Sequence, residues 1–224
     1  MRERVFLSIA VFSIFTAGVL AFAGSASAGV SEGKGIFTSK DCGGCHQTKG
    51  PAKEKTVEDM LSKKGPELWY AGSKFQKVCL EKWLHDPKPI RKMEYYSLTK
   101  KNGGNHGKLG AKEAKDVTDY LMSLKSADVK AVGIQPKNSP QGRLIFNKKQ
   151  GCYGCHETPQ GSNIVGGLTG PTMVGIGTRI NPDWIYAYLT NPKAFKPVKD
   201  MPTYVGVLSD FEMKSLSEFV ASFK

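Results

Sequence analysis

The chain of 224 residues has few cysteines, few histidines and few acidic residues for its length. Five cysteines are too few for a disulfide-dense scaffold, and an odd number cannot all pair with one another. Acidic residues number 20 against 32 lysines and arginines, so the formal net charge is +12. Hydrophobic residues make up 40% of the sequence, which excludes a disordered chain. The composition therefore indicates a basic globular protein of one large or two small domains.

After residue 23 the sequence has no long hydrophobic run, which excludes a protein that spans a membrane several times. Two arginines in residues 1–4 precede an uncharged stretch, residues 5–23, and the small residues Ala26-Ser27-Ala28 follow. A basic, an apolar and a small-residue segment in this order are typical of a secretory signal peptide. We therefore expect residues 1–28 to be a signal peptide cleaved after Ala28, and the protein to be periplasmic or otherwise exported. An uncleaved helix that tethers the protein to the membrane is the alternative.

The rest of the sequence contains an internal repeat. Residues 42–46, Cys-Gly-Gly-Cys-His, match residues 152–156, Cys-Tyr-Gly-Cys-His, and a Gly-Pro pair follows each motif, at Pro66 and Pro171. Further pairs match at an offset of 105 residues, or of 99 in the last segment: Gly72 with Gly177, Lys74 with Arg179, Leu84 with Leu189, Pro87 with Pro192, and Leu124 with Phe223.

Between the two copies, residues 126–140 contain Gly133, Pro136 and Pro140 and lack strong periodicity, which is typical of a linker. We predict two domains, residues 29–126 and 141–224, joined by a linker at 127–140.

Each copy predicts a small helical domain. Apolar residues recur at helical spacing toward the end of each copy, and the pairs Asp86-Pro87 and Asn191-Pro192 predict helix ends, because proline disfavours the α conformation in the residue before it. No run alternates well enough to indicate a sheet, so the fold class is all-α. The predicted helices lie at about 31–40, 78–84 and 110–125 in the first domain and about 141–150, 184–189 and 209–223 in the second.

The pattern Cys-x-x-Cys-His is the attachment signature of c-type haem. Two thiols three positions apart can each add to one vinyl group of a porphyrin, and the adjoining imidazole can then ligate the iron. A zinc site, a thioredoxin-like redox pair and structural disulfides are the alternatives, but zinc or a redox pair would need neither a repeated histidine nor two self-contained copies. A disulfide within such a motif would be strained. Two covalently attached haems are therefore expected, on Cys42, Cys45 and His46 and on Cys152, Cys155 and His156.

These motifs, the Gly-Pro pairs and Met201-Pro202 resemble those of the class I cytochrome c family, and the doubled form resembles the two-domain dihaem cytochromes of the c4 type. The resemblance covers nearly all of the chain after residue 28. It implies two tandem helical domains, each wrapped around one haem. It also implies that the carbonyl groups of Pro66 and Pro171 accept hydrogen bonds from the ligating histidines, which orients the imidazoles and makes them more basic.

The sixth iron ligand differs between the copies. In the second copy, Met201 occupies the methionine position of the family's distal loop. In the first, Met93 is the corresponding methionine, but Glu94 stands where the family has proline, and the following loop is longer. His106 and His85 are the alternative ligands there, and a site with two histidines would lower the potential of that haem.

Other residues have less specific interpretations. Cys79 is expected to be a small buried hydrophobe, with a thiolate iron ligand or a disulfide to a partner subunit as alternatives. Aromatic residues are expected mostly to line the haem pockets, and some to donate hydrogen bonds to haem propionates: Trp69, Tyr70, Trp83, Tyr95, Tyr96, Trp184, Tyr186, Tyr188 and Tyr204.

Basic residues gather near both expected distal loops, where they would steer an acidic redox protein toward an exposed haem edge: Lys88, Arg91, Lys92, Lys100, Lys101, Lys108, Lys193, Lys196 and Lys199. We expect an electron carrier rather than an enzyme, and no nucleic acid as partner. One alternative is a dihaem subunit of a larger, membrane-bound respiratory complex. A second is a haem enzyme, of the peroxidase or thiosulfate-oxidising type.

Overall fold

The structure is a computed structural model that describes residues 20–94, 97, 99–198 and 201–224. The basic segment and most of the apolar segment of the expected signal peptide lie outside the described residues, as do Tyr95, Tyr96 and Lys199. Among the described helices, none combines the length and the apolar character that crossing a bilayer requires.

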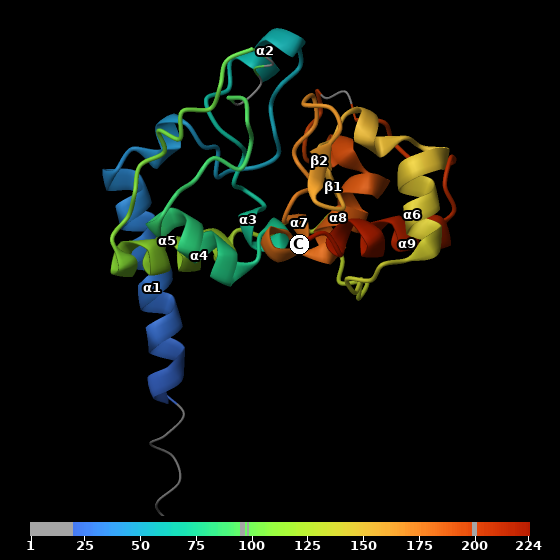
Figure 1. Ribbon diagram of the computed structural model, residues 1–224. Coiled ribbons are helices and arrows are strands. Elements are labelled where there is room, and N and C mark those ends of the chain that lie inside the picture. The colour runs from blue at the N-terminus through green and yellow to red at the C-terminus, as the bar shows by residue number, and fades with distance from the viewer. Residues whose placement is uncertain (1–19, 95–96, 98, 199–200) are drawn as a thin grey trace, which may run out of the picture.

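The first half of the chain is helical (Figure 1). The helices expected at about 31–40, 78–84 and 110–125 are confirmed, but the first is longer than expected and, within the described residues, extends from Leu20 to Ser39. Three short helices were not expected. The elements are α1 (Leu20–Ser39), η1 (Cys42–Gly44), α2 (Val57–Leu61), α3 (Ala71–Lys74), α4 (Lys77–His85) and α5 (Ala111–Ser123).

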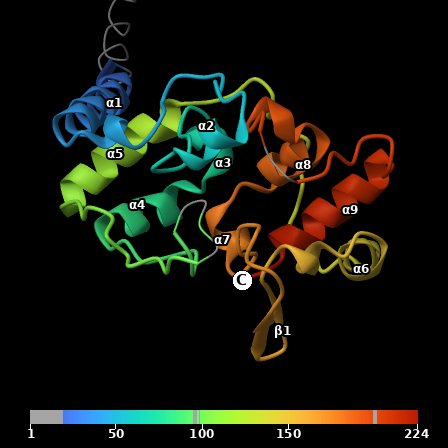
Figure 2. The ribbon, with the colours of Figure 1, turned by 90° about the horizontal axis from the view of Figure 1, so that it is seen from above.

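The second half is also mainly helical, and its three expected helices are confirmed. A two-stranded antiparallel hairpin, which Figure 2 shows projecting from this half, was not expected. Its strands have only three residues each, too few for an alternating pattern to be recognised. The elements are α6 (Pro140–Leu144), the π-helical turn η2 (Ile145–Lys149), η3 (Cys152–Gly154), β1 (Thr158–Gln160), β2 (Asn163–Val165), α7 (Ile176–Arg179), α8 (Pro182–Thr190), η4 (Pro192–Ala194) and α9 (Asp210–Ala221).

Local sequence explains where the helices begin and end. The Ser209 hydroxyl accepts a hydrogen bond from the Glu212 backbone N–H, and the Glu212 carboxylate accepts one from the Ser209 N–H, so a capping box starts α9. The Asn181 side chain caps α8 in a similar way. Helix α8 then ends at Thr190, just before the Asn191-Pro192 pair that predicted its end.

In each half, the helix before the cysteine motif crosses the last helix at a glycine. A Cβ atom on Gly33 would lie 1.9 Å from the Asp116 carbonyl oxygen, and one on Gly142 would lie 2.1 Å from the Ser215 carbonyl oxygen. No side chain fits in such a space. Because Asp116 and Ser215 are equivalent at the offset of 99 residues, the two crossings are the same contact made twice.

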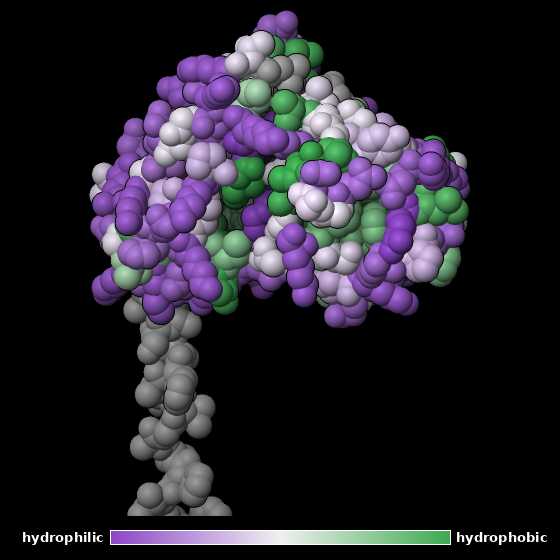
Figure 3. Space-filling view, viewed as in Figure 1, coloured by the Kyte–Doolittle hydropathy of each residue, from purple (hydrophilic) through white to green (hydrophobic). Residues whose placement is uncertain are grey.

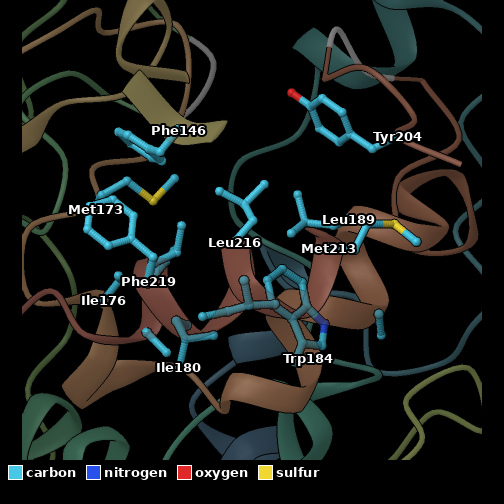
Figure 4. Packing of buried hydrophobic residues seen from close by; sticks show 14 of the residues in the cluster. Phe146, Met173, Ile176, Ile180, Trp184, Leu189, Tyr204, Met213, Leu216 and Phe219 are labelled. Atoms are coloured by element: carbon cyan, nitrogen blue, oxygen red, sulfur yellow. The ribbon is translucent and has the colours of Figure 1, made fainter. Parts of the chain in front are cut away.

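The buried hydrophobic side chains form two clusters. The smaller lies within the first half and consists of Phe37, Leu68, Ala71, Leu84, Leu109, Ala114, Val117, Tyr120 and Leu121. The larger lies mainly in the second half and includes Phe146, Trp184 and Leu216 (Figure 4). Tyr70 of the first half also belongs to the larger cluster. The first half therefore contributes a side chain to the interior of the second.

The two halves meet through equivalent segments, near α3 and α7 in Figure 1. The Gln76 backbone N–H donates to the Arg179 carbonyl at 3.0 Å, and the Asn181 N–H donates to the Lys74 carbonyl at 2.7 Å. Because positions 74 and 76 correspond to 179 and 181, the two hydrogen bonds are reciprocal. The side chains add to this pairing: Gln76 donates to the Gly177 carbonyl and Asn181 to the Ser73 carbonyl.

Candidate haem sites

The two cysteine motifs form the same backbone turn. In the first half, η1 follows Asp41, whose φ is 50°, and the His46 N–H donates to the Cys42 carbonyl at 3.0 Å. In the second half, η3 follows Gly151, whose φ is 57°, and the corresponding distance from His156 to Cys152 is 3.1 Å. All four thiols are free. Each turn thus gathers two thiols and one imidazole in a short stretch of chain.

Both motif histidines are held by a proline carbonyl. The Nδ1 atom of His46 lies 2.8 Å from the Pro66 carbonyl oxygen, and that of His156 lies 2.7 Å from the Pro171 oxygen. A carbonyl oxygen can only accept, so each Nδ1 donates its hydrogen and the lone pair remains on Nε2. This is the form of histidine that ligates a metal. That these residues hold haem stays a prediction.

The surroundings favour the neutral imidazole in both halves. Burial lowers the pKa of His46 and of His156, although the hydrogen bond to the proline carbonyl opposes this effect. The glycine before each proline allows the close approach, because a Cβ atom on Gly65 or Gly170 would lie 2.7 Å or 2.5 Å from the imidazole Cε1 atom. Each Gly-Pro pair therefore fits closely under its histidine.

In the second half, Met201 is partly buried and packs against the larger cluster. Tyr204 is buried close by, and its hydroxyl is hydrogen-bonded to the Cys152 thiol. Burial raises the pKa of that thiol to about 11, so it is protonated at neutral pH. Ligation of iron by Met201 stays a prediction.

The first site brings a different residue near its histidine. The ring centres of His46 and His106 lie 6.1 Å apart. Met93 lines a small pocket with Glu157, Gly170 and Thr172 of the second half, and its backbone pairs with Lys101. The His85 Nδ1 atom lies 3.0 Å from the Leu109 carbonyl oxygen. Among the three candidate ligands Met93, His85 and His106, His106 is the one whose ring lies near the ring of His46.

Residues 30–125 match the family model of cytochrome c. The first half of the chain therefore contains a cytochrome c domain. Such a domain implies a covalently bound c-type haem with its iron, and a role in electron transfer. Comparisons with curated proteins and with solved structures found no match.

The residues present fit a haem. The indole N–H groups of Trp69 and Trp184 are buried and have no hydrogen-bond acceptor among the residues that the structure describes. An unpaired buried donor costs about 1–3 kcal/mol, so an acceptor is expected beside each. The Lys74 ammonium group lies 4.8 Å from the centre of the Trp184 ring, and burial, together with Lys196, lowers the pKa of Lys74 to about 7. Haem propionates are anionic acceptors that would pair with both indoles and with this ammonium group.

Sequence reasoning did not identify Lys74 and its equivalent Arg179 as candidate site residues. Arg179 lies among backbone carbonyls of the second half and donates to those of Thr172 and Val174. The repeat had matched the two positions as basic residues, which was the available signal. Their place between the halves became clear only from the fold.

The remaining alternatives can be compared with the structure. Cys79 is a free thiol that is half-buried on α4, so it is less enclosed than the small buried hydrophobe that the sequence predicts. Within the described part of the chain, no group of three or more histidine, cysteine, aspartate or glutamate side chains is arranged to hold a metal ion. The zinc site considered for the two motifs together therefore has no counterpart there.

Proposed function

We propose that this chain binds two c-type haems and carries single electrons between redox proteins outside the cytoplasm. The observation that supports two haems most strongly is that both halves have the same backbone turn and the same contact between histidine and proline. The second half repeats the cysteine turn and the contact between histidine and proline of the first, with hydrogen-bond lengths of 2.7 and 2.8 Å. Only the first of these sites lies within the matched family region.

Each haem would be held by two thioether bonds and one imidazole. The thiols are those of Cys42 and Cys45 and those of Cys152 and Cys155, and the imidazoles are those of His46 and His156. When bound, the group supplies reversible one-electron chemistry at its iron. The chain fixes the imidazole through a proline carbonyl, surrounds the site with apolar side chains and supplies donors for the propionates.

The contact between the halves favours exchange of electrons within one chain. The reciprocal hydrogen bonds between residues 74–76 and 179–181 hold the halves at equivalent points. Tyr70 fixes them further, since it is buried in the interior of the second half. Two sites held in a constant geometry suit a carrier that accepts electrons one after another.

Export and acidic partners also belong to the proposal. The basic and apolar segments at the N-terminus support export. Figure 3 shows hydrophilic side chains over much of the first half, and the exposed cations Lys101, Lys108 and Lys193 lie near the distal loops. Such a surface would speed encounter with an acidic redox protein without tight binding.

A reductive titration of the exported protein tests this function. We expect two electrons per chain, and one electron per chain in the double variant Cys152→Ser/Cys155→Ser. The matched control, Cys42→Ser/Cys45→Ser, removes the other site and leaves one electron as well. Uptake of one electron by the unaltered chain, or of none, contradicts the proposal.

A further inference from the structure

The two distal sides differ in a way that identifies a ligand in the first half. From Pro87 to Leu109 the first half has six more residues than the second half has from Pro192 to Leu208. The longer loop contains His106, whereas the second half has no histidine besides His156. The additional residues therefore bring a second imidazole into one half only.

The separation of the His106 and His46 rings suits two imidazoles that hold one metal. A metal–imidazole nitrogen bond is about 2 Å long, so two imidazoles that ligate one metal from opposite sides have ring centres roughly 6 Å apart. The ring centres of His46 and His106 are 6.1 Å apart. The separation leaves room for one metal between the two rings.

Both rings also leave the same nitrogen available. The Nδ1 atom of His106 lies 2.9 Å from the Gly107 carbonyl oxygen, as that of His46 lies 2.8 Å from the Pro66 oxygen. Because the carbonyl groups accept, the lone pair of each imidazole is on Nε2. The two histidines are therefore in the tautomer that ligation requires.

The loop that contains His106 is well anchored. The Asn102 backbone N–H donates to the Lys92 carbonyl and its side chain to the Arg91 carbonyl, while the Gly104 N–H donates to the Asn102 side chain. The indole of Trp83 on α4 contacts the imidazole, with ring centres 4.6 Å apart. The position of His106 is thus set by the loop and by a helix of the same half.

Met93 is committed to another contact. It lines a pocket with Gly170 and Thr172 of the second half. The preceding residue, Lys92, forms a 2.5 Å ion pair with Glu157. Glu157 is buried and directly follows His156 in the sequence. This part of the loop therefore lies against the second half.

We propose that His106 is the sixth ligand of the first haem, in place of Met93, so that the protein has one haem with two histidine ligands and one with histidine and Met201. This inference rests on the proposed function. Methionine ligation raises the potential of a haem relative to ligation by a second histidine. The first haem is therefore the low-potential site and the second the high-potential site, and electrons at equilibrium reside on the second.

Spectra and a redox titration of the ferric, fully loaded protein test this assignment. A haem ligated by methionine has a weak far-red absorption band, and we expect that band from one haem in two. Met201→Ala should abolish the band, and Met93→Ala should leave the band and both potentials unchanged.

His106→Met, which keeps a ligand at the site, should double the band and raise the lower potential. His106→Ala should let the first haem bind cyanide readily, whereas His85→Ala, the matched control, should not.

The outcomes separate this inference from the proposed function. A chain with two haems in which Met93→Ala halves the far-red band, or in which His106→Met leaves it unchanged, overturns the ligand assignment alone. A chain whose mass shows fewer than two haems overturns the proposed function instead.

Discussion

The two halves place the same cysteine turn on differently built interiors. The first half has nine buried residues in its hydrophobic cluster, and the cluster of the second half has eighteen, including Tyr70 from the first, among the described residues. The first half also has a longer distal loop, and its buried Glu67 stands where the second half has the uncharged Thr172. The residues around each histidine are thus alike, while the parts that support them are not.

The first half is therefore expected to depend more on its haem. A bound apolar ring supplies buried surface that a small domain otherwise lacks. When the ring is absent, the half with the smaller cluster retains less buried apolar surface to stabilise its fold. Removal of one haem should therefore have a larger effect than any single substitution in the two halves.

Removal of the haem-binding thiols should affect the halves unequally. In Cys42→Ala/Cys45→Ala, we expect residues 29–126 to lose most of their protection from hydrogen exchange, because only the smaller cluster remains. In Cys152→Ala/Cys155→Ala, we expect residues 141–224 to keep protection in α8 and α9. Exchange measured half by half checks this prediction, and equal loss in both variants would show that the clusters do not decide the outcome.

Alanine at either crossing glycine should destabilise its own half strongly. Gly33→Ala and Gly142→Ala each place a Cβ atom about 2 Å from a carbonyl oxygen of the last helix. Overpacking of this kind costs about 3 kcal/mol. Denaturant unfolding of the loaded protein measures it, with Gly35→Ala as the control, because a Cβ atom there meets nothing within 4 Å. Similar losses at Gly33 and Gly142 support one shared fold, and a loss at only one of them argues against it.

Acid should weaken the buried ion pairs of Glu67 in the first half. Glu67 is 1% exposed and pairs with Lys63 and Lys196, and its counterpart in the second half is the uncharged Thr172. Burial raises the pKa of Glu67, but the two lysines outweigh it and hold the pKa below the usual value of 4.5. The folded form therefore gains stability above about pH 4.5 and loses it as the pH falls through the lower folded value.

The variant Glu67→Gln measures this contribution. At pH 7 we expect a loss of about 2 kcal/mol in the free energy of unfolding, since both lysines lose their charged partner. The difference from the unaltered protein should shrink as the pH falls below 4.5. A difference that does not change between pH 7 and pH 3 would mean that the ion pairs contribute nothing.

The smallest effect is expected at the contact between the halves. Gln76→Ala and Asn181→Ala each remove side-chain hydrogen bonds across it, which contribute about 1 kcal/mol apiece. The two variants should loosen the contact to the same degree, because the positions are equivalent. Hydrogen exchange at residues 74–76 and 179–181 checks this, and a large effect from one variant with none from the other would contradict the reciprocal arrangement.

The sequence predicts those parts of the fold that depend on local patterns. Six helices follow from apolar spacing and from the prolines at 87 and 192. The short hairpin escaped prediction because three residues per strand leave no period to detect. The contact between Lys74 and Asn181 escaped because it joins positions far apart in sequence, whose meeting depends on how both halves pack.

The candidate site divides in the same way. The thiols, the motif histidines and the two prolines follow from contiguous motifs with strict spacing. The sixth ligand of the first half does not, because Met93 and His106 lie in one loop and only its folded path decides which faces His46. The unpaired indoles of Trp69 and Trp184 likewise become visible only once their neighbours are known.

The intact mass of the exported protein after denaturation tests the central claim most directly. Covalent attachment at both motifs predicts the mass of the polypeptide plus two haem groups. The bare mass of the polypeptide, or a mass increased by one haem only, would contradict the account.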